Sequence, residues 1–592
     1  MSVQNLITDH IETWTTAKVQ KTKGGRGRKS NNQNQYGVKK LRELILELAV
    51  RGKLVPQDPN DEPASVLLEK IIEEQDRLIS DHGLRTKAKV EITQQEEYLT
   101  RQQGWSYYRL GNIARFIDYR GRTPKKIEAG IPLITAKNIR FGYISREPRE
   151  FITEAEYNEW MTRGFPKIGD ILFTTEAPLG NVALVDIEEK FALAQRAICF
   201  QLHVPEIAHF LKVLIMSRIF QNQLIENATG MTATGIKSSK LKEIPIPLPP
   251  LPEQHRIVAK VDELMALCDQ LEQEQTDNSE THQLLVKTLL DTLTHATDHE
   301  GFISTWKLIE QNFNILFTTE ASIDELKQTI LQLAVMGKLV PQDPNDEPAR
   351  VLLQKIAKEK AHLVKEGKIK KQKPLPEISE DEKPFGLPKS WEWSRLGEIA
   401  LLKGGFAYKS TAFTNTGEHQ VIRMGNIRPD YLRLKENPAY IPFELAHTTP
   451  EYEIHNGDIL LTMTGTKGKR DYLYSLSVQL DHLKNTQLYL NQRLCIVRGM
   501  YPMHEFINKV MKDDRLLTTI YSKSTGTANQ ANIGMVAISN WVLPFPPQRE
   551  QNRILDRVDE LMVLCDSLKK QLNDAQTTQV QLADAIVGQI IT

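Results

Sequence analysis

The chain has 592 residues, of which 40% are hydrophobic and 25% charged, and its 75 Lys and Arg balance 75 Asp and Glu. This composition is ordinary for a globular protein of several domains, and it excludes a wholly disordered chain. No run approaches the ~18 consecutive apolar residues that span a bilayer, and the N-terminal sequence lacks a signal-peptide pattern. We therefore expect a cytoplasmic protein.

The four cysteines lie far apart and form no Cys-x-x-Cys pair, and the histidines are scattered. This spacing argues against a disulfide framework or a zinc ribbon. Cys268 and Cys565 fall on the apolar stripes of expected helices, which predicts buried core thiols. We expect no metal or other cofactor to bind this chain.

The strongest pattern in the sequence is a tandem duplication. Residues 52–64 read GKLVPQDPNDEPA, and residues 337–349 repeat all thirteen letters. A second block, at residues 253–269, recurs with few changes at residues 550–566. Two long segments between these blocks share only short matches, such as GDIL. The pattern indicates two divergent modules of one fold, held by near-identical spacers.

The spacers show the periodicity of long amphipathic helices. Apolar residues at spacings of three and four predict helices over residues 253–294, 323–336 and 349–366. Such stripes are typical of a helical hairpin or a coiled coil.

The divergent segments predict β-rich modules, because short apolar runs alternate with Gly, Pro and charged residues. Residues 210–227 favour a helix. Residues 20–40 contain seven Lys or Arg and no acid, which is typical of a flexible basic loop. The strands expected in the first module cover residues 110–117, 131–134, 170–174, 182–185 and 197–202.

Three patterns resemble catalytic motifs only superficially. Asn-Pro-Ala-Tyr at residues 437–440 departs from the Asn-Pro-Pro-Tyr/Phe motif of amino-methyltransferases, and no glycine-rich cofactor turn precedes it. Residues 465–470 lack the Ser or Thr that ends a P-loop. A nuclease-like set of Asp170, Glu188 and Lys190 is incomplete in the second module. We therefore expect no catalytic residue and no enzyme activity in this chain.

The remaining chemistry is that of DNA recognition. Lys and Arg exceed acids by four across residues 111–126, and small polar loops at 229–235 and 524–530 occupy corresponding places in the two modules. Arg and Lys neutralise phosphates, while Arg, Asn, Gln and Thr can bind base edges. Each patch alone is typical of a solvated surface, but their recurrence at equivalent places favours DNA binding. The residues expected to contact DNA are Arg120, Arg122, Lys125, Lys137, Asn138, Arg140, Arg196, Thr232, Thr234 and Lys237 in the first module, and Lys409, Arg423, Asn426, Arg428, Lys467, Lys469, Arg470, Arg493, Asn529 and Gln530 in the second.

Together these features resemble the specificity subunit, HsdS, of type I restriction–modification systems, in one of its longer forms. The most specific element is PLPPLPEQHRIVAKVDELMALCDQLE at residues 247–272, which recurs as PFPPQREQNRILDRVDELMVLCDSLK at residues 544–569. The twin LAVRGKLVPQDPNDEPA and LAVMGKLVPQDPNDEPA segments agree with it. The resemblance covers nearly the whole chain.

The resemblance implies an α+β fold with a pseudo-twofold arrangement. Two β-rich target recognition domains, at about residues 105–250 and 391–547, would be separated by conserved helical regions that pair antiparallel as a coiled coil, with the stretch around Asp277 beside the stretch around Lys358. These regions would be an N-terminal segment over residues 1–100, a central region over 251–385 and a C-terminal helix over 548–592.

The resemblance also implies a non-catalytic subunit that binds double-stranded DNA. Each recognition domain would read half of an asymmetric bipartite site, with a gap set by the helices. Two modification subunits would bring S-adenosylmethionine, and two restriction subunits would bring ATP, Mg²⁺ and DNA cleavage. Two alternatives stay open, a self-contained adenine methyltransferase–specificity fusion and a non-catalytic helical scaffold protein.

Overall fold

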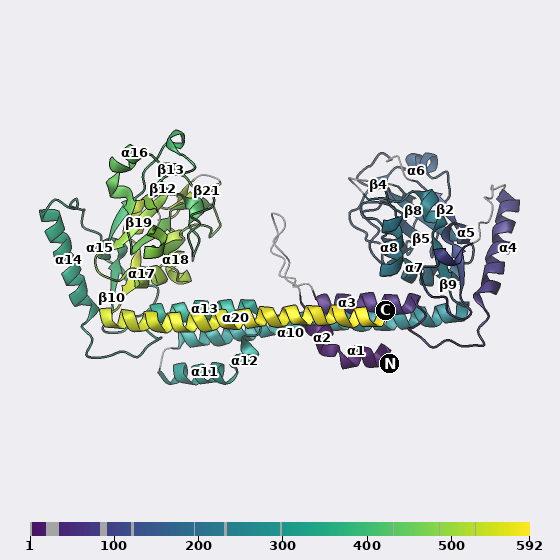
Figure 1. Cartoon of the computed structure of the whole chain (residues 1–592), viewed down its shortest axis with the longest axis horizontal. Coiled ribbons are helices and arrows are strands. Elements are labelled where there is room, and N and C mark those ends of the chain that lie inside the picture. The colour runs from purple at the N-terminus through teal and green to yellow at the C-terminus, as the bar shows by residue number, and fades with distance from the viewer. Residues whose placement is uncertain are drawn as a thin grey trace. The chain divides into compact units, whose positions relative to one another are not determined.

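The protein forms two compact units, unit 1 (residues 1–279 and 574–592) and unit 2 (residues 280–573) (Figure 1). Each unit contains one β-rich module and a set of spacer helices. No helix in the described part of the chain is long and apolar enough to cross a membrane. The structure, a computed structural model, describes residues 3–18, 35–82, 92–119, 124–194, 196–229, 234–296, 299–429, 431–484, 486–526 and 529–591.

In the first module the first strand pairs with the last. β1 (Ser106–Arg109) pairs antiparallel with β9 (Pro245–Leu248), so the module begins and ends beside the start of α10 (Leu251–His295). Between them lie a four-stranded sheet in the order β2-β8-β5-β6 and a three-stranded sheet in the order β4-β3-β7. Their bounds are β2 (Ala114–Asp118), β3 (Ile131–Ile134), β4 (Phe151–Ile152), β5 (Ile171–Thr174), β6 (Val182–Leu184), β7 (Ala192–Leu193) and β8 (Ala197–Leu202).

The structure confirms most of the strands expected in the first module and corrects two elements. Residues 110–113 form a helical turn, α5 (Leu110–Ile113), because its buried Leu110 and Ile113 face the core at helical spacing. The helix expected over 210–227 is divided into α7 (Ala208–Met216) and α8 (Arg218–Glu226). Ser217 between them is extended, and its side chain caps α8 by accepting a hydrogen bond from the backbone of Phe220. Two further helices of this module are α6 (Glu154–Trp160) and α9 (Ser238–Glu243).

Three helices carry the first module within unit 1: α3 (Tyr36–Val50), the first part of α10 and the last part of α20 (Gln548–Ile591). Arg42 of α3 pairs with Asp269 of α10 at 2.5 Å, and the Tyr36 hydroxyl donates to Asp584 of α20 at 2.8 Å. The remaining helices of unit 1 are α1 (Val3–Asp9), α2 (Ile11–Thr16) and α4 (Ala64–His82).

The basic loop expected over residues 20–40 is corrected at its end. Tyr36 to Lys40 belong to α3, because Val38 and Leu41 are buried and anchor the first turns of that helix. Residues 19–34 lie outside the described part of the chain.

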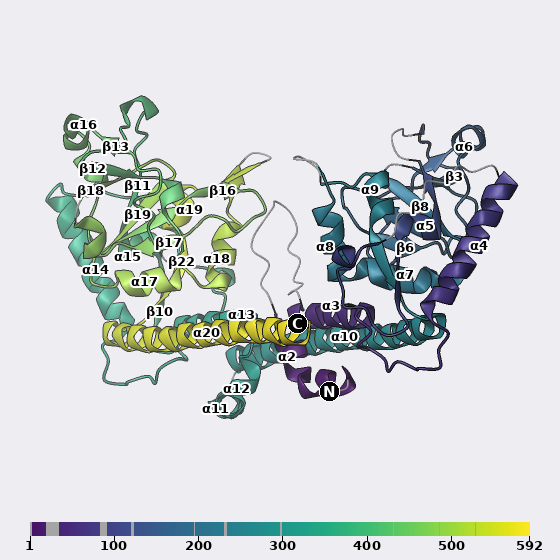
Figure 2. The ribbon, with the colours of Figure 1, turned by 45° about the vertical axis from the view of Figure 1, so that its right-hand side comes forward.

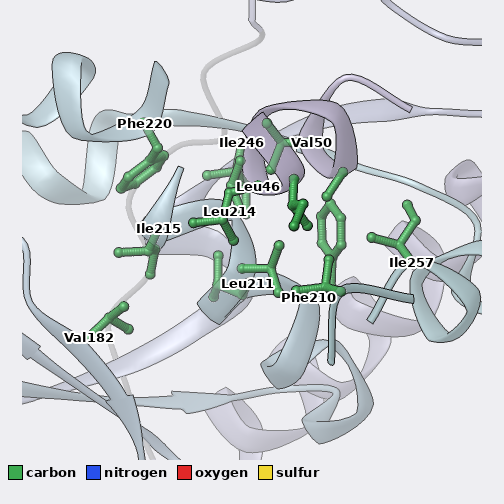
Figure 3. Packing of buried hydrophobic residues seen from close by; sticks show 14 of the residues in the cluster. Leu46, Val50, Val182, Phe210, Leu211, Leu214, Ile215, Phe220, Ile246 and Ile257 are labelled. Atoms are coloured by element: carbon green, nitrogen blue, oxygen red, sulfur yellow. The ribbon is translucent and has the colours of Figure 1, made fainter. Parts of the chain in front are cut away.

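A continuous core joins the first module to its helices. Phe210 on α7 packs in one cluster with Val50 of α3 and Ile257 of α10 (Figure 3). The Trp105 ring meets Phe210 edge-on at 6.1 Å between ring centroids, and its indole N–H donates to the Glu253 carboxylate at 3.1 Å. The module therefore sits on the spacer through buried contacts, not through a loose linker.

The second module repeats this plan inside unit 2. β10 (Glu392–Arg395) pairs antiparallel with β22 (Val542–Phe545), which closes the module next to the start of α20. Its sheets have the orders β11-β19-β15-β17, β13-β12-β18-β14 and β16-β21-β20. The bounds are β11 (Ala400–Gly404), β12 (His419–Ile422), β13 (Tyr440–Ile441), β14 (Glu453–Ile454), β15 (Asp458–Thr462), β16 (Thr464–Thr466), β17 (Ser475–Ser477), β18 (Gln487–Leu490), β19 (Leu494–Gly499), β20 (Thr525–Gly526) and β21 (Gln530–Asn532).

The spacer helices of unit 2 establish which helices run antiparallel. Lys569 of α20 pairs with Asp324 of α13 (Glu320–Val335) at 3.1 Å, and Lys327 pairs with Asp566, so α13 and α20 run in opposite directions. His282 of α10 contacts the Ile315 carbonyl, and Lys338 donates to the Thr294 carbonyl of α10. The segment from Ile315 to Lys338, which contains α13, therefore runs parallel to α10. Within unit 2, α10 and α20 are therefore antiparallel (Figure 2).

This arrangement corrects the expected partner of α10. The helix around Lys358, α14 (Ala349–Lys365), instead packs against α15 (Leu396–Ile399) of the second module. Lys360 fixes this contact by donating to the carbonyls of Gly397 at 2.6 Å and Ala400 at 3.0 Å. The other helices of unit 2 are α11 (His299–Gln311), α12 (Phe313–Leu316), α16 (Phe443–His447), α17 (His504–Val510), α18 (Asp514–Tyr521) and α19 (Met535–Ser539).

The cysteines confirm the expectation of core thiols. All four are buried, and burial raises the pKa of Cys268 to about 11 and that of Cys495 to about 12. A thiol with a raised pKa carries little thiolate at neutral pH, so these groups are poor nucleophiles and poor metal ligands.

Candidate nucleic-acid interface

Three loops meet at one end of the main sheet of the first module. They are the strand-end turn after β5 (residues 175–181), the arginine turn before β8, which carries Arg196, and the polar loop, of which the structure describes residues 229, 234 and 235. The backbone N–H of Thr175 donates to the Arg196 carbonyl at 2.9 Å, and the N–H of Ile236 donates to the Thr175 carbonyl at 3.0 Å. Thr175 therefore joins the strand-end turn to the arginine turn and to the residue that follows the polar loop, and a bridge between Glu176 and Gly235 joins the loop's own end; we call this the three-loop surface.

Arg196 is held at the centre of this surface in an uncommon backbone conformation. Its φ is 63°, in the left-handed region that costs a non-glycine residue about 1–3 kcal/mol. Its side chain is half exposed and pairs with Glu176 at 3.0 Å. Strain kept at one residue beside a polar loop is typical of a functional turn.

The same turn recurs in the second module. Arg493 precedes β19 with a φ of 68°, and its carbonyl accepts the N–H of Met463 at 2.9 Å, at the end of β15. The N–H of Ile533 donates to the Met463 carbonyl at 2.9 Å, so Met463 has the role that Thr175 has in the first module.

The polar loop of the second module lies beside a cationic loop. β16 pairs with β21, with Thr466 opposite Gln530 and Thr464 opposite Asn532. This pairing places exposed Gln530 next to the turn that presents Lys467 and Lys469, both also exposed. The sheet edge therefore combines hydrogen-bonding side chains with positive charge.

Arg470 of that turn has structural partners. It pairs with Asp514 at 3.2 Å, donates to the Thr518 hydroxyl at 2.8 Å, and lies over the Tyr521 ring at 5.4 Å. These contacts anchor the cationic loop on α18. Arg470 remains half exposed, so it can contact a ligand only by sharing or leaving these partners.

The structure contradicts the base-reading role expected for the two asparagines. Asn138 is 1% exposed, and its amide bonds its own turn, accepting from the Thr135 N–H at 3.1 Å and donating to the Pro148 carbonyl at 3.0 Å. Asn426, 5% exposed, accepts from the Arg423 N–H at 2.9 Å in the same way. Both amides are saturated inside the protein, so we remove them from the candidate set.

The other predicted residues differ in their exposure. Arg423 and Arg428 are half-buried, since Arg423 donates to the Asn437 carbonyl and Arg428 to the Ile427 carbonyl. The exposed ones are Lys125, Lys137, Arg140, Thr234, Lys237, Lys409 and Asn529. Arg120, Arg122 and Thr232 lie outside the described residues.

The sequence missed two acids that balance these cations. Burial by itself would raise the pKa of the Glu150 carboxyl. The ammonium groups of Lys126 at 2.7 Å and Lys137 at 3.4 Å outweigh it, so the pKa is lowered. Glu176 pairs with Arg196. No local pattern signals either acid, because both meet their cations across distant parts of the sequence.

The catalytic look-alikes are not assembled by the fold. Lys190 pairs with Glu154, whereas Asp170 accepts from the Gln201 amide at 2.9 Å, so the nuclease-like set is not brought together. Among the residues that the structure describes, no group of three or more His, Cys, Asp and Glu could hold a metal ion.

Comparison with known proteins decides the family. A family model described as the type I restriction modification DNA specificity domain matches residues 102–279 and 388–576. The chain belongs to this family. It is 38% identical to the type I restriction enzyme EcoAI specificity subunit of Escherichia coli, with all of both chains covered, and 37% identical to the EcoEI specificity subunit, with 99% of each covered. A solved HsdS subunit from Thermoanaerobacter tengcongensis is 17% identical, with 84% of this chain and 98% of that chain covered and a TM-score of 0.42.

The expected family is thus confirmed. The chain is a DNA sequence-specificity subunit of a type I restriction–modification system, a non-catalytic component of its complex. The expected α+β fold of two modules alternating with long helices is confirmed as well. This assignment takes the place of the two alternatives from the sequence, a methyltransferase–specificity fusion and a helical scaffold protein.

Proposed function

We propose that each module reads one half of a bipartite double-stranded DNA site with its three-loop surface. The single observation that carries this proposal is the recurrence of the left-handed arginine turn, at Arg196 and at Arg493, beside a polar loop in modules whose surface sequences otherwise diverge. A shared scaffold with different side chains is what reading two different half-sites requires.

The test replaces one arginine at a time in the reconstituted complex. Arg196→Gln keeps a long polar side chain but removes the charge and the two-pronged donor set, so we expect one position of one half-site to relax, with a cost of ~1–3 kcal/mol. Arg493→Gln should relax the other half-site. Methylome sequencing of hosts that carry each variant reads both outcomes.

Two exposed lysines outside the three loops serve as matched controls. Lys190, paired with Glu154, and Lys484, paired with Asp481, also lie on the modules. Their Gln variants should leave both half-sites unchanged. If Arg196→Gln alters both half-sites, or neither, the modules do not read in the proposed way.

We also propose that two modification subunits dock on the spacer helices. Unit 1 exposes Leu267 of α10 and Leu582 of α20, and unit 2 exposes Leu564 and Leu285, their counterparts 297 positions away. Exposed apolar side chains on helices support a protein interface, and the same pair in each unit fits two copies of one partner. S-adenosylmethionine would bind to these subunits, and ATP and Mg²⁺ to two restriction subunits.

Native mass spectrometry tests the docking sites. Leu285→Asp with Leu564→Asp should remove one modification subunit and leave the other, because only unit 2 is altered. Ile168→Asp, at an exposed apolar residue of the first module, is the control and should leave the mass unchanged. Loss of both copies, or of neither, would contradict the proposal.

A further inference from the structure

Each module exposes an aromatic ring at the tip of one turn near the three-loop surface. In the first module the turn runs from Ile139 to Ile144, and its tip exposes Tyr143 by 62% and Phe141 by 45%. In the second module the corresponding turn, Ile427 to Leu432, exposes Tyr431 by 52%. An exposed large apolar side chain is not unusual by itself, but here it recurs at one place in two divergent modules.

A backbone hydrogen bond spans each of these two turns, which we call the tyrosine tips. The N–H of Arg140 donates to the Tyr143 carbonyl at 2.9 Å, and the N–H of Arg428 donates to the Tyr431 carbonyl at 3.1 Å. The buried amide of Asn138 fixes the base of the first tip through its own turn. In the first tip the ring is therefore carried by a hydrogen-bonded backbone, which lowers the entropy cost of binding a ligand.

The tyrosine tips are attached to the proposed DNA surface. In the first module the Asn181 amide, at the end of the strand-end turn, donates to the Ile139 carbonyl at 2.9 Å, and the Gly142 N–H donates to the Val182 carbonyl at 2.8 Å. In the second module the Thr464 hydroxyl contacts the sulfur of Met424, which lies three residues before the turn, at 3.1 Å. The first tip thus adjoins the strand end that also holds the arginine turn, and the second tip follows a residue that contacts the equivalent strand end.

The charge around the tips favours a polyanion as the ligand. Arg140 is exposed in the first tip, and Lys137 lies just before it. Just after the second tip, the Arg433 guanidinium lies 5.6 Å from the centroid of the Tyr431 ring, donates to the Tyr431 hydroxyl at 3.1 Å and pairs with Glu436 at 2.9 Å. A ring flanked by cations suits a nucleic acid, because the cations can bind phosphates while the ring contacts a base.

We propose that Tyr143 and Tyr431 stack on DNA bases at the edge of each half-site, as apolar contacts that do not read sequence. This inference rests on the proposed function, since it requires each module to bind one half-site. Aromatic rings stack on any base, and an inserted apolar side chain can also unstack a base step and bend the duplex. The arginine turn and polar loop would then supply specificity, and the tyrosine tip would supply sequence-independent affinity.

Substitutions in the complete complex test the inference. Tyr143→Ala should weaken binding of the specific duplex about 5- to 150-fold, the range measured for loss of one base–aromatic stack. Tyr143→Phe should bind within about twofold of the wild type, since stacking uses the ring and not the hydroxyl. The recognised sequence should not change in either variant. Tyr431→Ala should act in the same way on the second module, whereas Tyr431→Phe also loses the hydrogen bond that the Tyr431 hydroxyl accepts from Arg433.

Fluorescent and pre-opened duplexes separate stacking from a purely structural role. With 2-aminopurine scanned through the edge of the half-site, the wild-type complex should change the fluorescence at one position and Tyr143→Ala should not. A duplex with an abasic site opposite that position is already unstacked, so it should recover part of the affinity that Tyr143→Ala loses. A variant that was merely misfolded would show no such recovery.

Exposed aromatic residues elsewhere on the modules provide controls. Phe165 is 52% exposed in the first module and Phe443 is 64% exposed in the second, and their Ala variants should bind DNA normally. If Tyr143→Ala binds as tightly as the wild type while Arg196→Gln relaxes its half-site, the stacking inference is wrong and the proposed function stands. If Arg196→Gln and Arg493→Gln change no half-site, the proposed function itself fails.

Discussion

The two units share the contacts that join each module to its spacer helices, but they differ at the three-loop surface. At the base, the two units make the same contacts: Trp105 donates to Glu253 at 3.1 Å, and Trp391 donates to Glu550 at 3.0 Å. At the three-loop surface, the first module pairs Arg196 with Glu176 and has a single bridge between Glu176 and Gly235, whereas the second module presents the Lys467 loop on the strand pair β16–β21. The contacts to the spacer are kept while the surface that we propose to bind DNA changes.

The ion pairs of the twin spacer loops extend the comparison. Arg256 binds Asp61 at 2.6 Å in unit 1, and Arg553 binds Asp346 at 2.7 Å in unit 2. Each pair fixes the repeated PQDPNDEP loop to the start of a long helix. The loop has the same sequence in both copies, and in both its aspartate binds the equivalent arginine of a long helix.

The largest expected effect comes from lengthening the frame. Seven residues inserted into α10 after Asp277 and into α20 after Asn573 add about 10 Å, close to three base pairs, and nearly restore the helix face. We expect the unspecified gap to lengthen, with loss of methylation at the original site and no change in either half-site. Methylome sequencing measures both.

A single insertion sharpens this test. Seven residues placed in α10 alone should abolish specific methylation, because α10 and α20 would no longer keep register with each other. A doubly inserted variant that methylates the original gap at full rate would show that another part of the complex sets the spacing.

Next in size is the loss of a Trp–Glu contact at the base. Trp105→Ala removes a buried ring and leaves the Glu253 carboxylate without its donor, so we expect a loss of about 3–5 kcal/mol in the unfolding free energy of unit 1. Trp391→Ala should cost unit 2 a similar amount, because Phe210 and Phe506 meet the two rings edge-on at 6.1 and 6.3 Å. Urea unfolding followed by hydrogen exchange in each module measures the two losses.

The two Trp variants are each other's control. Trp105→Phe should recover most of the packing and lose about 1–3 kcal/mol for the unpaired carboxylate. Costs that differ greatly between the two units would mean that the bases are not equivalent, in spite of their shared contacts.

A smaller effect is expected at the arginine turns, where stability and recognition oppose each other. Arg196→Gly relieves the left-handed strain, so unit 1 should gain about 1 kcal/mol while its half-site loses specificity. Arg196→Ala keeps the strain and should lose specificity without that gain. Thermal unfolding measures the stability of the two variants, and methylome sequencing measures their specificity. A destabilised Arg196→Gly variant would show that the side chain, through Glu176, stabilises the turn more than the strain costs.

The sequence predicted the frame better than the reading surface. The duplication and the apolar periodicity located the long helices, because both signals repeat over many residues. The partner of α10 was wrong, since periodicity gives the buried face of a helix and not the helix that covers it. Asn138 was misassigned for a related reason: its type suits a base reader, but its burial depends on a turn that closes back on Pro148.

The smallest expected effect concerns one lysine that only unit 2 has. Lys360 of α14 is largely buried against α15, and burial lowers its pKa to about 8; the corresponding residue of α4 is Gln75. The unfolded chain keeps its Lys pKa near 10.5. From about pH 8 to 10.5 the unfolded state therefore binds more protons, so the stability of unit 2 should rise with pH in this window.

Lys360→Met removes the titrating group and keeps the apolar stem, so the rise in the stability of unit 2 with pH should disappear. Unit 1 has Gln75 at the equivalent position, so this position should give it no such rise in the wild type or in the variant. The gain is expected to be about 1 kcal/mol or less, because the ammonium also donates to the Gly397 and Ala400 carbonyls, and those bonds oppose deprotonation. Urea unfolding of unit 2 between pH 7.5 and 10 measures it, with Lys355→Met, at an exposed lysine of the same helix, as the control. If the stability of unit 2 still rises with pH in Lys360→Met, another group is responsible for the pH dependence. Lys360 would then distinguish the two spacers by its packing alone.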